Sequence, residues 1–320
     1  MNLLVTGGAG FIGSHFVRAV LADRLPGLEG AAITVLDKMT YAGNYSNLGP
    51  VAEDERLDFV PGDVTDDPVV SAAVRGHDAV VHFAAESSPV AGTDFATPVV
   101  VGTQVLLEAA RRHGVARFAL VSAGEVYGPI DTGAWTERSH LSPASPRAAA
   151  KAGADLIALA YHRTHGVPVV VTRSSPTYGP YQHPERTVPR LVTALLAGRT
   201  VPLAGEGGRV REWLHVEDHC RGVALALAQG RPGEIYHIAG SIELSDHDLL
   251  TQILAECGAG WDRVVEGPED RTAGHRLALD DDKIRRELGW RPRMEFAAGL
   301  RGAVNWYRAN ESWWRPLLPD

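Results

Sequence analysis

Short apolar runs alternate with longer amphipathic stretches through the first half of the chain. The apolar runs are rich in valine, leucine, isoleucine and phenylalanine and predict β-strands at 3–6, 33–36, 57–60, 79–83, 118–122 and 167–172. The amphipathic stretches between them predict helices at 11–22, 101–113 and 148–165. Strands that alternate with helices favour a parallel sheet built from right-handed crossovers.

The regular alternation ends near Arg173. Loop-forming residues follow it: Pro176, Pro180, Pro184, Pro189, Pro202, Gly205, Gly207 and Gly208. We therefore predict an α/β fold, with a Rossmann-type doubly wound parallel sheet in residues 1–173. Residues 174–320 are expected to form a smaller mixed α/β lobe for a substrate, and parts of this segment could return to the first sheet.

Composition and charge exclude several classes of protein. The chain has 320 residues, of which 45% are hydrophobic and 22% charged, and this allows a sizeable core. A formal net charge of −8 argues against a nucleic-acid surface. No apolar run reaches membrane-spanning length, and no basic segment precedes the first apolar run. Cys220 and Cys257 lack the spacing of a zinc site or disulfide framework. A cytoplasmic protein is expected.

A glycine-rich segment, Gly7-Gly8-Ala9-Gly10-Phe11-Ile12-Gly13, joins the first strand to the first helix. Gly7 and Gly10 permit a tight turn whose backbone amides can approach a pyrophosphate, and Gly13 lets the helix pack closely on the strand. The helix N-terminus also favours negative charge. This strand–turn–helix context predicts a dinucleotide site, with Phe11 and Ile12 beside the cofactor.

Acidic residues follow the next two strands. Asp37 closes the second strand, where its carboxylate can accept hydrogen bonds from both hydroxyls of a ribose. The same charge would repel a 2′-phosphate, so NAD is favoured over NADP, although the neighbouring Lys38 weakens that preference. Asp63 and Val64 follow the third strand and are expected to meet the adenine.

Longer segments of the sequence are more specific. They are 4–14, 36–44, 82–87, 125–128, 178–182, 211–220 and 306–307. Together they resemble the dTDP-glucose 4,6-dehydratases, a family of extended short-chain dehydrogenases, from Met1 to about Trp314. The resemblance implies a lobe that holds NAD, with Ala84 and Ala85 beside it. It also implies a lobe that holds a nucleotide-diphosphate sugar, most simply a dTDP-hexose, and a homodimer joined by a four-helix interface.

The reaction of that family oxidises C4 of the sugar, eliminates water across C5 and C6, and returns the hydride to C6. A phenolate assisted by a lysine removes the C4 hydroxyl proton, a carboxylate removes the C5 proton, and an acid protonates the leaving hydroxyl. By resemblance, Glu125 is the C5 base and Lys151 contacts the nicotinamide ribose. Ser122 is a further candidate catalytic residue.

The remaining catalytic positions depart from the family pattern. Arg147 occupies the tyrosine position of Tyr-x-x-x-Lys, and Ala123 and Gly124 replace a threonine and an aspartate. Arginine stays cationic and cannot accept a proton, so Arg147 cannot be the C4 base. It could instead clamp a substrate anion, act as a replacement electrostatic group, or point into solvent.

Substrate contacts are also taken from the resemblance. They are Ser87, Glu125, Arg186, Arg211, Arg271 and His275. Arginines suit a diphosphate because they bind its oxygens in pairs. Ala204 replaces an aromatic residue expected against the base, which makes thymine less certain. His215 and His219 stand four residues apart without a third ligand, so no metal site is expected.

Three functions are compatible with this sequence. The first is a dehydratase-like lyase whose bases come from elsewhere, such as Tyr127, Tyr178 or His183. The second is conversion of a nucleotide sugar that is already a 4-ketone, by epimerisation or elimination, because Glu125 alone could enolise a ketone. The third is a non-catalytic NAD-binding scaffold.

Overall fold

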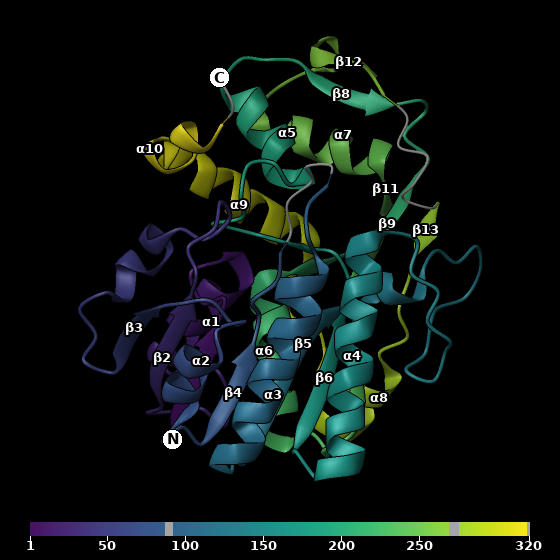
Figure 1. The fold of residues 1–320 in the computed structure, drawn as a ribbon. Helices are drawn as coiled ribbons and strands as arrows, with labels where there is room; N and C mark the ends of the chain where they lie inside the picture. The colour runs from purple at the N-terminus through teal and green to yellow at the C-terminus, as the bar shows by residue number, and fades with distance from the viewer. Residues whose placement is uncertain (87–91, 269–274, 319–320) are drawn as a thin grey trace.

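The computed structural model describes residues 1–86, 92–268 and 275–318. Its main sheet has the strand order β10-β6-β5-β4-β1-β2-β3, and every neighbouring pair is parallel (Figure 1). The strands are β1 (Asn2–Thr6), β2 (Ala32–Asp37), β3 (Leu57–Pro61), β4 (Ala79–His82), β5 (Arg117–Ala123), β6 (Val169–Ser174) and β10 (Ile235–Ile238). The predicted doubly wound parallel sheet is confirmed.

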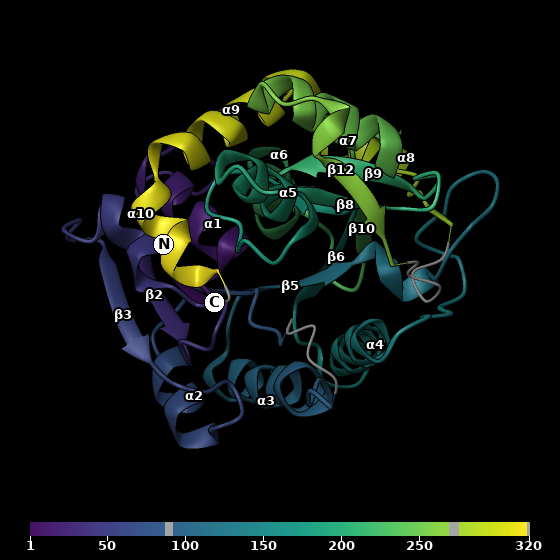
Figure 2. The ribbon, with the colours of Figure 1, turned by 90° about the horizontal axis from the view of Figure 1, so that it is seen from above.

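Helices cover both faces of this sheet, as the view from above shows (Figure 2). One face carries α1 (Phe11–Leu21) and α6 (Val216–Gln229). The other carries α2 (Asp67–Val74), α3 (Gly102–His113) and α4 (Pro146–His165). Because both faces are covered, the strands are apolar on both sides, which explains their nearly continuous apolar sequences.

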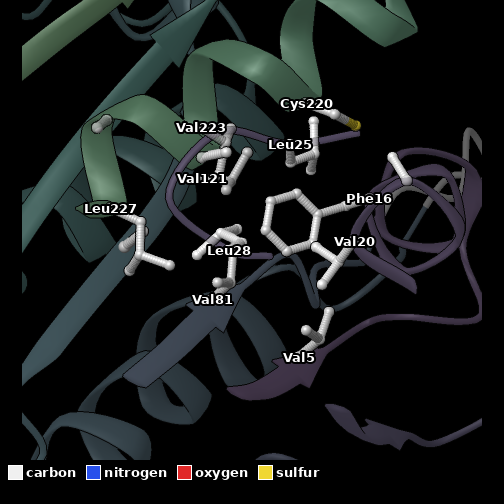
Figure 3. Close-up of a cluster of buried hydrophobic side chains, with 14 of the residues drawn as sticks. Val5, Phe16, Val20, Leu25, Leu28, Val81, Val121, Cys220, Val223 and Leu227 are labelled. Atoms are coloured by element: carbon white, nitrogen blue, oxygen red, sulfur yellow. The ribbon is translucent and has the colours of Figure 1, made fainter. Parts of the chain in front are cut away.

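The core of the first face shows how alternate strand residues are used. Figure 3 shows Phe16 and Val20 of α1 packing with Val5 of β1 and Val223 of α6. The neighbouring Leu4 belongs to the core of the opposite face. This alternation fixes which way each side chain points, and therefore also fixes the side chains just beyond each strand end.

Local sequence sets the ends of the helices. The side chain of Ser145 accepts a hydrogen bond from the Ala148 amide and so caps α4, while Pro146 occupies its first turn. Gly166 ends α4 in the left-handed conformation, with φ of 71°. In contrast, α1 begins after Gly10 without a side-chain cap, so its first amides remain open to a ligand.

The second lobe has a small mixed sheet, as predicted. In it β9 (Val210–His215) pairs antiparallel with β11 (Ile242–Ser245) and parallel with β7 (Thr177–Tyr178) and β13 (Arg276–Leu277). The other elements of this half are β8 (Val201–Ala204), β12 (Val264–Gly267), α5 (Thr187–Leu196), α7 (Asp246–Cys257), α8 (Asp282–Leu288), α9 (Phe296–Ala309) and α10 (Glu311–Trp314). Two elements of this half return to the main sheet: β10 pairs with β6, and α6 packs on one face of the sheet.

The helices of the structure also bear on membrane insertion. Among the described residues, no helix is both long enough and apolar enough to span a bilayer. The longest described helix, α4, has 20 residues but carries charged and polar side chains along its length.

Candidate active site

The carboxyl ends of the main strands open into one cavity of about 680 Å³, which residues of the second half of the chain also line. Parallel strands place all their carboxyl ends at one sheet edge, and ligands of such folds bind there. The cavity brings together most of the residues singled out from the sequence: Gly7, Gly10, Phe11, Ile12, Gly13, Asp37, Lys38, Asp63, Val64, Ala84, Ala85, Ser122, Glu125, Arg147, Lys151 and Arg186.

Gly7 and Gly13 of the glycine-rich turn leave no room for a side chain. A Cβ on Gly7 would lie 2.5 Å from the backbone nitrogen of Ala84, and φ there is +72°. A Cβ on Gly13 would collide with the carbonyl oxygen of Gly7. The turn therefore brings bare backbone and the uncapped start of α1 to the cavity wall, an arrangement that fits the pyrophosphate of a dinucleotide.

Asp37 is held ready to accept hydrogen bonds from a ribose. Its Oδ2 accepts from the Ala9 amide at 2.9 Å and its Oδ1 from the Met39 amide at 2.8 Å. Lys38 turns to Asp63 instead, with 2.6 Å between Nζ and Oδ2, and this bond raises the pKa of Lys38. Because the Lys38 charge is engaged by Asp63, it does less to attract a 2′-phosphate, which favours NAD.

Arg147 and Glu125 form an ion pair inside the cavity. Glu125 lies in a short turn after β5, and Arg147 lies in the first turn of α4. The guanidinium of Arg147 donates to Oε2 of Glu125, and the two side chains are 29% and 39% exposed. The residue in the family's tyrosine position thus faces the site and its carboxylate, and it does not point into bulk solvent.

Lys151 lies one turn further along α4. Its Nζ donates to the carbonyl oxygen of Val121 at 2.9 Å. Burial, and after it the positive charge of Arg147, lower the pKa of Lys151 to about 8. Ser122 follows Val121 on β5 and is buried in the same wall of the cavity. The site therefore holds two cationic groups beside one carboxylate, where the family pattern has a tyrosine, a lysine and two carboxyl groups.

The position of the missing acid is filled by an apolar side chain. A Cβ on Gly124 would lie 2.9 Å from Cδ1 of Leu279 and 3.2 Å from its Cγ. Leu279 packs in a buried cluster with Val126, Tyr127 and Ala152. A carboxylate at residue 124 would need Leu279 to move, so the loss of the acid is accommodated by the surrounding core.

Two tyrosines that the sequence offered as substitute bases are committed to the core. The Tyr127 hydroxyl bonds to Nε2 of His237 at 2.7 Å and accepts from Arg173, and burial raises the pKa of Tyr127 to about 12. The Tyr178 hydroxyl donates to the Phe296 carbonyl at 3.2 Å, and burial raises the pKa of Tyr178. Only His183, of the three, lines the cavity.

Other predicted substrate contacts lie elsewhere. Arg211 donates from Nη1 to the carbonyl oxygens of Val210 and His275, at 2.7 and 3.4 Å. In the described part of the chain, neither Arg211 nor His275 is among the residues that line the cavity. Ser87 and Arg271 fall outside the described residues.

Sequence reasoning missed part of the lining. These residues include Glu86, Ser174, Ser175, Thr177, Trp213 and His219. Ser175 directly follows the observed strand β6, which ends two residues beyond the predicted strand 167–172. From the sequence, His219 is a candidate only as a metal ligand. In the structure its Nδ1 forms a hydrogen bond with Oγ1 of Thr177 at 2.9 Å.

Comparison with known proteins agrees with this geometry. The family described as GDP-mannose 4,6 dehydratase matches residues 4–303. A dTDP-glucose 4,6-dehydratase of Streptomyces niveus is 53% identical over 325 residues, covering 100% of this chain and 97% of the relative. The dTDP-glucose 4,6-dehydratase of Streptomyces venezuelae, solved with NAD bound, has a TM-score of 0.97 at 53% identity, covering 99% and 100% of the two chains. That of Bacillus anthracis, also with NAD, gives 0.93 at 40% identity, covering 99% and 100%.

The glycine turn, the acid at the end of β2 and the doubly wound sheet define a dinucleotide-binding enzyme fold of the extended short-chain dehydrogenase class. Within that class the similarity extends along almost the whole chain. The chain belongs to the dTDP-glucose 4,6-dehydratase family. Its solved relatives hold NAD, the cofactor that the sequence predicts.

The glycine turn gives a direct test of the cofactor site. Gly13→Ala should weaken NAD binding and destabilise the fold by about 1–3 kcal/mol, because its methyl group would overpack the turn. The NAD released on denaturing the purified protein and the denaturant midpoint measure both effects. Gly302→Ala, in α9 with open space around it, should keep both properties. Full NAD content in Gly13→Ala would contradict this placement of the cofactor.

Proposed function

We propose that this protein is an NAD-binding enzyme that converts a nucleotide-diphosphate sugar, most simply a dTDP-hexose, whose C4 is already a ketone. The observation that carries the proposal is the ion pair of Arg147 with Glu125 in the cavity. A permanent cation in the family's tyrosine position cannot take the proton of a C4 hydroxyl. The same cation is well suited to a substrate in which that oxidation has already happened.

Enolisation needs a base and a stabiliser of negative charge. Glu125 can remove a proton from the carbon next to the ketone, and the electron pair then moves onto the C4 oxygen. Arg147 can donate hydrogen bonds to that oxygen as its charge develops, as an oxyanion hole does. The ion pair keeps the Glu125 carboxylate beside the cation that would stabilise the enolate. Glu125 would then act on the carbon next to the ketone, and Arg147 on the C4 oxygen.

The cofactor residues support the NAD part of the proposal. Gly7, Gly10 and Gly13 fit a pyrophosphate, and Asp37 is fixed where a ribose is expected. When bound, NAD supplies hydride transfer to and from a sugar carbon. A cytoplasmic location remains part of the proposal, supported by the unpaired thiols of Cys220 and Cys257.

A second candidate function is the family's own dehydration, with Lys151 as the C4 base. It is favoured by one observation, the lowering of the Lys151 pKa to about 8. An amine with such a pKa is partly neutral near pH 8 and can accept a proton. Against this candidate, Arg147 has displaced the phenol and Leu279 fills the space of the acid.

Deuterium exchange separates these functions. The NAD-loaded protein is incubated in deuterated water with either dTDP-glucose or dTDP-4-keto-6-deoxyglucose, and each sugar is followed by mass spectrometry. The ketone should gain deuterium next to C4, and dTDP-glucose should stay unchanged. Glu125→Gln should slow the exchange by about 10²-fold or more, because the base is lost. Arg147→Met should slow it by about 10²–10³-fold through loss of the oxyanion donor.

Glu266→Gln, an exposed carboxylate on β12, serves as the matched control and should exchange normally. Loss of water from dTDP-glucose would contradict the proposal and favour dehydration by Lys151. No exchange into either sugar, with NAD still bound, would favour a non-catalytic scaffold.

The homodimer expected from the family is also proposed for this chain. The helices α3 and α4 lie side by side on one face of the main sheet (Figures 1 and 2). Val101, at the start of α3, is 44% exposed, and Leu156, on α4, is 55% exposed. Large apolar side chains on adjacent helices suit a contact with the same two helices of a second copy.

The oligomeric state tests this surface. The wild-type protein should sediment as a dimer, and Leu156→Glu should shift it towards monomer because a buried, unpaired charge opposes association. Ile242→Glu changes an exposed apolar residue on β11 in the second lobe and should leave the dimer intact. A monomeric wild type, or a fully dimeric Leu156→Glu, would contradict this interface.

A further inference from the structure

A second carboxyl group stands directly behind the wall of the cavity. Ser175 follows β6 and lines the cavity, and it is only 3% exposed. Its Oγ lies 2.5 Å from Oε2 of Glu212, which lies on β9. Glu212 is not among the described residues that line the cavity. Ser175 therefore stands between Glu212 and the cavity.

Ser175 and Glu125 leave neighbouring strands at the same edge. In the parallel pairing of β5 with β6, Ala123 lies opposite Ser174. Neighbouring strands are about 4.8 Å apart, so residues just beyond this pair leave the same edge of the sheet close to one another. Glu125 and Ser175 are such residues, and both line the cavity.

Leu279 links the missing acid to this second carboxyl group. Its side chain fills the space next to Gly124, and its backbone nitrogen donates to Oε2 of Glu212 at 3.3 Å. The residue that excludes a carboxylate from position 124 therefore also helps to hold the carboxyl group of Glu212. Position 124 is a glycine, so it supplies no carboxyl group that could act as the acid in place of Glu212.

We propose that Ser175 is the proton donor to the enolate that Glu125 forms, and that Glu212 is the positioning residue that supplies Ser175 with its proton. This rests on the proposed function, since it assigns the second half of that reaction. Glu125 takes a proton from carbon, and the electron pair moves to the C4 oxygen. Ser175 then gives its proton to the carbon and takes the proton of Glu212. Glu125 afterwards releases a proton to water, and Glu212 regains one from water.

The hydrogen bonds of Ser175 make this relay depend on protonation. Its Oγ accepts from the Gly240 amide at 3.1 Å. When Glu212 is ionised, the hydroxyl proton of Ser175 is used in the bond to the carboxylate. When Glu212 is protonated, its own proton can fill that bond, because a hydroxyl has two acceptor sites. The Ser175 proton is then free to face the cavity.

The surroundings keep Glu212 protonated close to neutral pH. Burial raises the pKa of Glu212 to about 7, while the bonds from Ser175 and from the Leu279 amide oppose that rise. Glu243, opposite on β11, raises it slightly, and its own carboxylate is bound by Arg276 of β13 at 2.6 Å. The protonated form of Glu212 is the one that supplies the proton. Formation of the product, the sugar reprotonated by Ser175, should therefore fall as pH rises through about 7.

The test uses the NAD-loaded protein and dTDP-4-keto-6-deoxyglucose in deuterated water. Glu212→Gln keeps the shape of the side chain but cannot supply a proton, so product formation should slow by about 10²-fold. Deuterium exchange into recovered substrate should persist, because Glu125 can return a solvent deuteron to the face from which it took the proton. The fall in rate near pH 7 should vanish. Ser175→Ala should give the same separation of exchange from product formation.

Glu243→Gln is the matched control, and it should keep normal product formation with the pH midpoint unchanged or slightly lower. Unchanged product formation and an unchanged pH profile in Glu212→Gln would overturn the relay while leaving the proposed function intact. Parallel loss of exchange and product in a folded Glu212→Gln would also overturn it, since that pattern indicates a structural role. Absence of exchange in the wild type would instead contradict the proposed function, and the relay with it.

Discussion

All strands of the main sheet run in the same direction, and this constraint determines where every functional group lies. Because the carboxyl ends of β1, β2, β4, β5 and β6 share one edge, residues far apart in sequence line one cavity. The glycine turn after β1 leaves room for a cofactor at that edge, and the Ala9 amide holds Asp37 where a ribose is expected. The turn after β5 and the first turns of α4 then deliver Glu125, Arg147 and Lys151 to the same space.

Within this frame, the proposed function depends on Arg147, the residue that the resemblance places in the tyrosine position. A tyrosine in the family's catalytic position would cycle between neutral and anionic forms, whereas Arg147 remains cationic. It binds Glu125 and helps to lower the pKa of Lys151. Leu279 packs against Gly124, the position where the resemblance places an acid. These changes form a consistent set suited to stabilising negative charge on a substrate oxygen.

The sequence alone predicts the main sheet well, and the residues it proposes for the cofactor line the cavity, because both depend on local patterns. A strand, a glycine turn and a helix are contiguous, and Asp37 follows its strand directly. The contact of Ser175 with Glu212 could not be predicted, since it joins β6 to a strand of the second lobe. The contact of Leu279 with Gly124 joins two segments that are 155 residues apart in the sequence. The hydrophobic pattern along the chain cannot predict such a contact. The sequence shows that Arg147 departs from the family's pattern, and the structure shows that it pairs with Glu125.

The central claim is that Arg147 prevents oxidation of a C4 hydroxyl. The most direct measurement is rapid mixing of the NAD-loaded protein with dTDP-glucose, followed by the fluorescence of the reduced cofactor. The wild type should show no reduction over many minutes, and Arg147→Tyr should show it if the pocket still accepts the parent sugar. Reduction of the cofactor by the wild-type protein at a rate typical of turnover, about 1 s⁻¹ or faster, would contradict the account, because some other group would then be removing the C4 proton.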